Sequence, residues 1–142
     1  MMLMHRRFAF AAAFGLVVAA LTTDAALAQR VPPGPPAIEA EFREFIGGFR
    51  QALRANDANA VAALSRFPMQ HNGDMHDQAA FLRTTYRQLF TQRNRTCLQN
   101  VRPVYDKDGE GTHSYVVFCG DTGFYFTKKA DGFRFAETGV ND

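Results

Sequence analysis

The sequence has no tryptophan and only two cysteines, and it carries neither a run of basic residues nor a catalytic motif. The net charge of the whole chain is +2, and its lysines and arginines are scattered rather than grouped. A nearly neutral chain attracts polyanions weakly, so nucleic acid is not an expected partner. The glycine-flanked nucleophilic serine of α/β-hydrolases is also missing, so that class of enzyme is not indicated.

The sequence also lacks an apolar run long enough to span a bilayer as a helix. The longest run, Phe8 to Leu21, is shorter than the roughly 18 residues that a spanning helix needs. It follows Arg6 and Arg7, and the small-x-small pattern Ala26–Ala28 comes after it. We therefore expect residues 1–28 to be a cleaved signal peptide, with a periplasmic or secreted mature protein and no membrane span after cleavage.

The next residues, 29–36, contain four prolines and a glycine. This composition disfavours a regular element and predicts a stiff, extended leader. The remaining residues, 37–142, are enough for one small domain and too few for two.

The two cysteines, Cys97 and Cys119, both lie in the part expected to be exported. An oxidising compartment favours a structural disulfide, and redox-active or metal-binding thiols normally have a closer spacing. The turn-rich stretch 106–110 predicts a hairpin, and both cysteines are equally distant from Asp108 at its centre. We therefore expect them to face each other across two antiparallel strands.

Periodicity divides the domain into a helical first part and an alternating second part. Phenylalanines and aliphatic residues at helical spacing predict a helix from about residue 38 to 53. Asp57 predicts the cap of a short helix through Leu64, and an extended segment begins at Phe67. A polar loop, a third helix and four strands are then expected, at about 71–77, 78–93, 95–105, 112–119, 122–129 and 133–139.

This order of elements resembles the nuclear transport factor 2-like superfamily. The residues that suggest it are the Phe-rich first helix, the cap at Asp57, the pair Phe67-Pro68, and Phe81, Tyr86 and Phe90 on the third helix. The resemblance runs over about residues 37–139. It implies an α+β fold, in which three N-terminal helices pack on a strongly curved antiparallel sheet that forms a cone with an apolar cavity. Such folds serve isomerases, dehydratases and binding domains, so the fold constrains function poorly.

The favoured role is non-catalytic binding of a small apolar molecule in the cone, with no cofactor. A homodimer formed through the sheet face is compatible with this role. The aromatic residues expected to line the cavity are Phe45, Phe49, Tyr86, Phe90, Tyr115 and Phe135. Tyrosine hydroxyls in an apolar pocket can fix the orientation of a ligand.

Two alternatives have candidate residues of their own. An acid/base enzyme would use Glu137, because strict alternation places it on the same strand face as Phe133 and Phe135. A divalent metal could be held in the 71–77 loop, where suitable ligands are dense: His71, Asp74 and His76. Asp77 is more useful there as a helix cap, and a solvated loop is the favoured interpretation.

Overall fold

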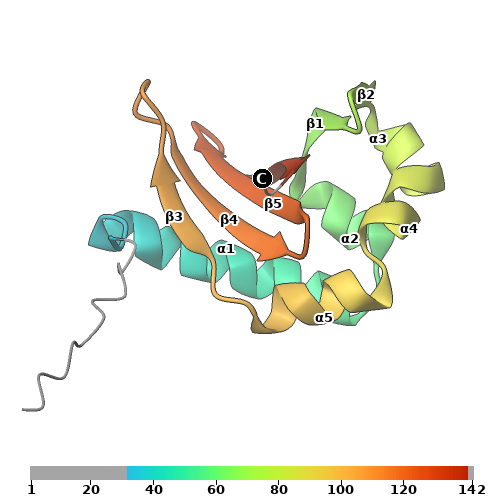
Figure 1. Ribbon diagram of the computed structural model, residues 1–142, viewed down its shortest axis with the longest axis horizontal. Coiled ribbons are helices and arrows are strands. Elements are labelled where there is room, and N and C mark those ends of the chain that lie inside the picture. The colour runs from blue at the N-terminus through green and yellow to red at the C-terminus, as the bar shows by residue number, and fades with distance from the viewer. Residues whose placement is uncertain (1–31, 141–142) are drawn as a thin grey trace, which may run out of the picture. The chain divides into compact units, whose positions relative to one another are not determined.

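Helix α1 (Pro36–Arg54) is the long helix that the strands cross in Figure 1; it begins at a proline and buries one stripe of its side chains. The missing N–H of Pro36 is harmless in the first turn of a helix. The buried stripe consists of Phe42, Ile46, Phe49, Ala52 and Leu53. The structure is a computed structural model that describes residues 32–140, so the expected signal peptide and residues 29–31 lie outside the described residues.

The next two helical stretches begin at the aspartates that the sequence suggested. The carboxylate of Asp57 accepts a hydrogen bond from the Ala60 N–H at 3.0 Å and caps α2 (Ala58–Ala63). The carboxylate of Asp77 does the same for Ala80 at 2.7 Å. The helical stretch that follows has a π-helical turn in its middle and consists of α3 (Gln78–Ala80), η1 (Phe81–Thr85) and α4 (Tyr86–Leu89).

The strand expected at 95–105 is wrong, because most of that segment is helix α5 (Gln92–Asn100). The hydroxyl oxygen of Thr91 accepts a hydrogen bond from the Asn94 N–H at 3.3 Å and caps its first turn. At its other end, the Arg50 guanidinium donates hydrogen bonds to the carbonyl oxygens of Leu98 and Val101, at 2.8 and 3.0 Å. These bonds satisfy carbonyl groups that the end of a helix leaves without partners.

The sheet has six strands in the order β2-β1-β6-β5-β4-β3. It is mixed, because β1 and β6 pair in parallel while the other neighbours are antiparallel. The expectation of a purely antiparallel sheet is therefore wrong at one pair, where the Phe135 N–H donates to the Leu64 carbonyl at 2.9 Å. The strands are β1 (Ser65–His71), β2 (Asp74–His76), β3 (Val104–Lys107), β4 (His113–Cys119), β5 (Thr122–Lys129) and β6 (Gly132–Val140).

The strands curve across α1 (Figure 1). The core between them consists largely of aromatic rings. Phe49 of α1 is fully buried, and its ring centroid lies 5.0 Å from that of Phe126 and 6.0 Å from that of Phe90. The Phe135 ring lies 5.6 Å from Phe90 and 5.8 Å from Phe49. Aromatic pairs at these separations add to the stabilisation that comes from burial of their apolar area.

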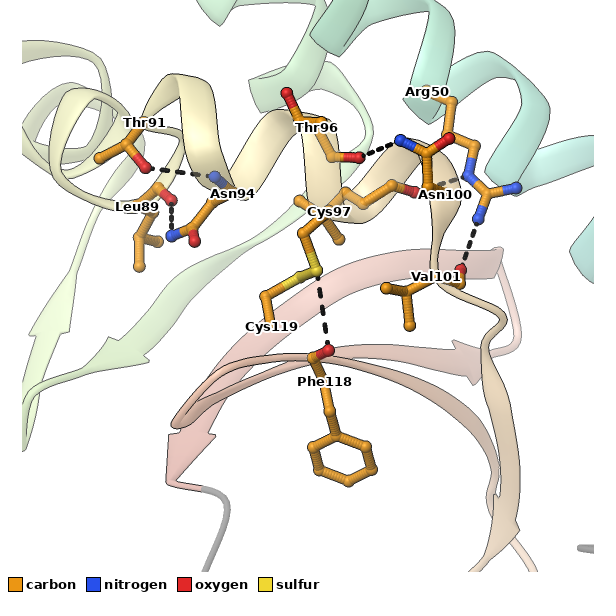
Figure 2. Close-up of a disulfide and its surroundings, with 11 residues drawn as sticks. Arg50, Leu89, Thr91, Asn94, Thr96, Cys97, Asn100, Val101, Phe118 and Cys119 are labelled. Carbon is orange, nitrogen blue, oxygen red and sulfur yellow. Dashed lines mark hydrogen bonds between the residues drawn. A yellow bond between two sulfur atoms is a disulfide. The ribbon is translucent and has the colours of Figure 1, made fainter.

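The disulfide between Cys97 and Cys119 is present, but it does not cross a hairpin. Val104 of β3 pairs with Val116 of β4, so the hairpin is centred on Glu110 and Cys97 lies before it in helix α5. The bridge joins α5 to the end of β4, with the two Cα atoms 5.9 Å apart (Figure 2). It therefore fixes a helix onto the sheet.

Removing the bridge by combining Cys97→Ala with Cys119→Ala is expected to lower the free energy of unfolding by about 3 kcal/mol. The reason is that the bridge closes a sequence separation of 22 residues and so restricts the unfolded chain. Urea denaturation of the oxidised protein and of the double variant measures the difference. A reductant should leave the double variant unchanged, and equal stability of the two oxidised samples would contradict the expectation.

Candidate functional site

A half-open pocket of about 700 Å³ lies at one end of the sheet. The β1–β2 turn, the end of β6, the β4–β5 turn, α4 and α5 all contribute to it. Most of its side chains are polar and uncharged, and none of the lining residues is lysine or arginine. The lining consists of Gln70, His71, Asn72, Gly73, Gln88, Leu89, Asn94, Asp121, Thr122, Thr138, Gly139 and Val140.

One wall of the pocket is a β-hairpin where a polar loop was expected. Asn72 and Gly73 have positive φ angles of 52° and 86°, as a tight two-residue hairpin turn requires, and β2 pairs back onto β1. The pairing of Met69 with His76 places the side chains of His71 and His76 on the same face. Their ring centroids are 5.8 Å apart, so a regular element aligns the two histidines where a solvated loop was expected.

His71 is held between two neighbours and is only 8% exposed. Its Nδ1 lies 3.1 Å from the Thr138 hydroxyl, and its Nε2 lies 3.1 Å from the Asn72 side-chain nitrogen. Because that amide nitrogen donates to Nε2, Nδ1 carries the proton of the neutral ring and donates to Thr138. Burial lowers the pKa of His71 from its usual value, and the His76 imidazole lowers it further.

The same geometry does not favour a metal at this hairpin. Both ring nitrogens of His71 are engaged, and Nδ1 of His76 lies 2.9 Å from the Thr85 hydroxyl. Asp74 pairs with His71 across the turn but is exposed. Within residues 32–140, no group of three or more histidine, cysteine, aspartate or glutamate side chains is placed to hold a metal ion.

The rest of the polar lining is available to a ligand. The side chains of Gln70, Gln88, Asp121 and Thr122 have no hydrogen-bond partner within the described part of the chain. Asn94 differs, because its amide donates to the Leu89 carbonyl at 2.7 Å (Figure 2). The pocket thus has one wall that the hydrogen bonds of His71 hold in place. Its other walls carry carboxamide, hydroxyl and carboxylate groups that are free to bind a ligand.

The disulfide joins two segments that continue into this lining. Cys97 follows Asn94 by one turn of α5, and Cys119 precedes the turn that carries Asp121 and Thr122. Figure 2 shows Asn94 and Cys97 on the same helix, with the bridge leading from Cys97 to Cys119 of β4. The bridge therefore sets the distance between two walls of the pocket.

The aromatic residues expected to line an apolar cavity lie elsewhere, in the core. Five of them are at most 5% exposed, and Phe45 is half-buried against the same cluster. Tyr86 packs on Phe90 at 5.2 Å between ring centroids, and Phe45 packs on Phe49 at 6.0 Å. The structure thus brings the rings together, and they occupy the side of the sheet that faces α1.

The two tyrosines of that set have different surroundings. The Tyr86 hydroxyl donates to the Asn56 side chain at 2.9 Å. Tyr115 stacks on Phe42 with ring centroids 3.8 Å apart, and its hydroxyl has no hydrogen-bond partner in the region from residue 32 to 140. Burial raises the pKa of both phenols, which favours their neutral forms. Neither tyrosine lines the polar pocket.

Glu137, the candidate acid/base residue, is exposed on the other face of the sheet. Phe126 pairs with Phe135, whereas Tyr125 pairs with Glu137, so Ala136 is an extra residue in β6. Such a bulge shifts the alternation of side chains by one position. Glu137 therefore faces away from Phe133 and Phe135, so the alternation that made it the acid/base candidate does not hold.

Sequence reasoning found His71 but missed most of the pocket. Its walls come from five separate segments, and isolated glutamines and threonines carry no local pattern that distinguishes a pocket from a solvated surface. The Asn72-Gly73 pair was the one usable signal, because it is the preferred sequence of a two-residue hairpin turn. Comparison of the chain with protein-family models, curated proteins and solved structures gave no significant match.

The buried His71 is expected to make the folded state less stable as the pH falls. In the unfolded chain a histidine titrates near pH 6.5, and the pKa of folded His71 is lower, so the unfolded state binds the proton first. The destabilisation of the folded state by His71 is absent above about pH 6.5. It grows as the pH falls from there through the pKa of the folded protein.

Urea denaturation between about pH 7.5 and about pH 5 should therefore show a shallower loss of stability in His71→Gln than in the wild type. His113→Gln, which changes a histidine outside the pocket, is the matched control. An unchanged pH slope in His71→Gln would show that His71 does not carry the effect.

Proposed function

We propose that this chain is a small exported binding protein without catalytic activity, and that its polar pocket holds a small, uncharged polar molecule. The observation that carries the proposal is the set of side chains in the pocket that have no partner in the described chain, Gln70, Gln88, Asp121 and Thr122. Carboxamides and hydroxyls both donate and accept hydrogen bonds, so they match neutral ligands that do the same. The lack of lysine and arginine in the lining argues against an anionic ligand.

Two features support export. The sequence of residues 1–28 has the order of a signal peptide, although these residues lie outside the described part of the structure. The Cys97–Cys119 bridge is typical of proteins in oxidising compartments. Between residues 32 and 140, no helix has the length and hydrophobicity needed to cross a membrane.

A nuclear transport factor 2-like fold also stands as a proposal. Its support is the order of elements: a long helix, a capped short helix, a third helical stretch and then the antiparallel strands β3 to β6. In that framework the aromatic core corresponds to the interior of the cone. Because the rings there contact one another, we propose the polar pocket rather than the cone interior as the binding site.

The binding proposal is tested by titrating a pool of neutral polar compounds into the ¹⁵N-labelled, oxidised protein and recording amide chemical shifts. The expected result is that shifts concentrate at the β1–β2 turn, Asp121, Thr122 and the end of β6. Gln88→Ala should weaken binding by about threefold to tenfold, because it removes one hydrogen-bonding group. Gln51→Ala, an exposed glutamine on α1, should have no effect. Shifts confined to other surfaces would contradict the proposal.

A homodimer is a second candidate role, and it is compatible with the first. The register places Val104, Phe118 and Tyr125 on the sheet face opposite to the aromatic core, and all three are half-buried. Figure 2 shows the Phe118 ring directed away from α5 and the disulfide. Apolar side chains gathered on an open sheet face are suited to contact with a second copy.

Sedimentation equilibrium tests the dimer. The wild type is expected to sediment as a dimer at high concentration, and Val104→Lys, which adds a charge to this face, should shift it toward monomer. Glu110→Lys in the exposed β3–β4 turn is the control and should leave the association unchanged. A wild type that stays monomeric at the highest soluble concentration would exclude this role.

A further inference from the structure

The end of β6 runs past the end of its neighbour β1 and leaves one edge open. β1 turns away at Asn72 and Gly73, whereas β6 continues to Val140. Gly139 and Val140 pair with Gly123 and Thr122 of β5 on one side only. Along residues 32–140, no strand pairs with their other side, and both residues line the pocket. The pocket therefore contains a short piece of free strand edge.

A free strand edge presents backbone N–H and C=O groups in the spacing that another extended chain matches. Gln70 and Gln88 lie on different walls of the pocket and have no side-chain partner within the described residues. Their carboxamides can bond both the N–H and the C=O groups of a peptide backbone. None of the lining residues is phenylalanine or tyrosine, so the pocket lacks the broad apolar ring face on which a sugar stacks.

We propose that the pocket accepts an extended, uncharged peptide segment, which adds as a strand beside Gly139 and Val140. The peptide continues the sheet at the place where β1 turns away. Main-chain hydrogen bonds supply the affinity, as in other cases of strand addition. Asp121 is the one carboxylate in the lining, so acidic peptides are disfavoured. This inference rests on the proposed binding function and names the class of ligand.

The test uses a pool of capped hexapeptides made from Gly, Ala, Ser, Thr, Val and Asn, titrated into the ¹⁵N-labelled, oxidised protein. The expected result is a change in the amide shifts of Gly139 and Val140. The tightest peptide is then made in two N-methylated forms, each with alternate amide nitrogens blocked. Because alternate N–H groups of a strand point to opposite edges, one form should lose at least about tenfold in affinity and the other should bind nearly as well as the parent.

The outcomes separate this inference from the function on which it rests. Equal binding of both N-methylated forms, or peptide shifts confined to other surfaces, would overturn strand addition. A parallel titration with neutral disaccharides and trisaccharides distinguishes the remaining cases. If the sugars shift the pocket amides and no peptide does, the peptide class is wrong and the binding function stands. If neither pool shifts them, both are overturned.

Discussion

The Cys97–Cys119 bridge is the constraint on which the geometry of the pocket depends most directly. It joins α5 to the end of β4, and each of these segments continues into a wall of the pocket. Asn94 lies on the helix side, and Asp121 and Thr122 lie on the sheet side. A covalent link with Cα atoms 5.9 Å apart leaves the two walls little freedom to separate. The third wall, the β1–β2 hairpin, is held separately by the bond between His71 and Thr138.

The aromatic core explains why the binding groups lie at the end of the sheet and not beneath it. Rings from α1, from Phe90 just after α4 and from the strands fill the face of the sheet that contacts α1. The centroid separations among Phe49, Phe90, Phe126 and Phe135 are 5.0–6.0 Å. Close packing of this kind leaves few voids. The side chains of Gln70, Gln88, Asp121 and Thr122, which have no partner in the described chain, line the pocket at the end of the sheet instead.

Local patterns predicted much of the fold and little of the site. The caps at Asp57 and Asp77 and the strands β4 to β6 follow from side-chain chemistry and alternation near each residue, and the structure confirms them. The pairing of residues that are distant in the sequence was harder to predict. The midpoint of the two cysteines coincided with a turn and suggested a hairpin register, whereas helix α5 actually carries Cys97. Glu137 was misplaced because one extra residue, Ala136, reverses the face of every side chain after it.

Native mass spectrometry of the oxidised protein, purified from its source cells without refolding, shows whether the pocket holds a ligand. We expect a copurified neutral compound, seen as an added mass that leaves when the protein is denatured. An increment that matches a divalent metal ion would contradict it, because His71 has no free ring nitrogen. A protein that carries no added mass, even in a freshly prepared extract, would contradict the binding role and leave the open sheet face as the functional surface.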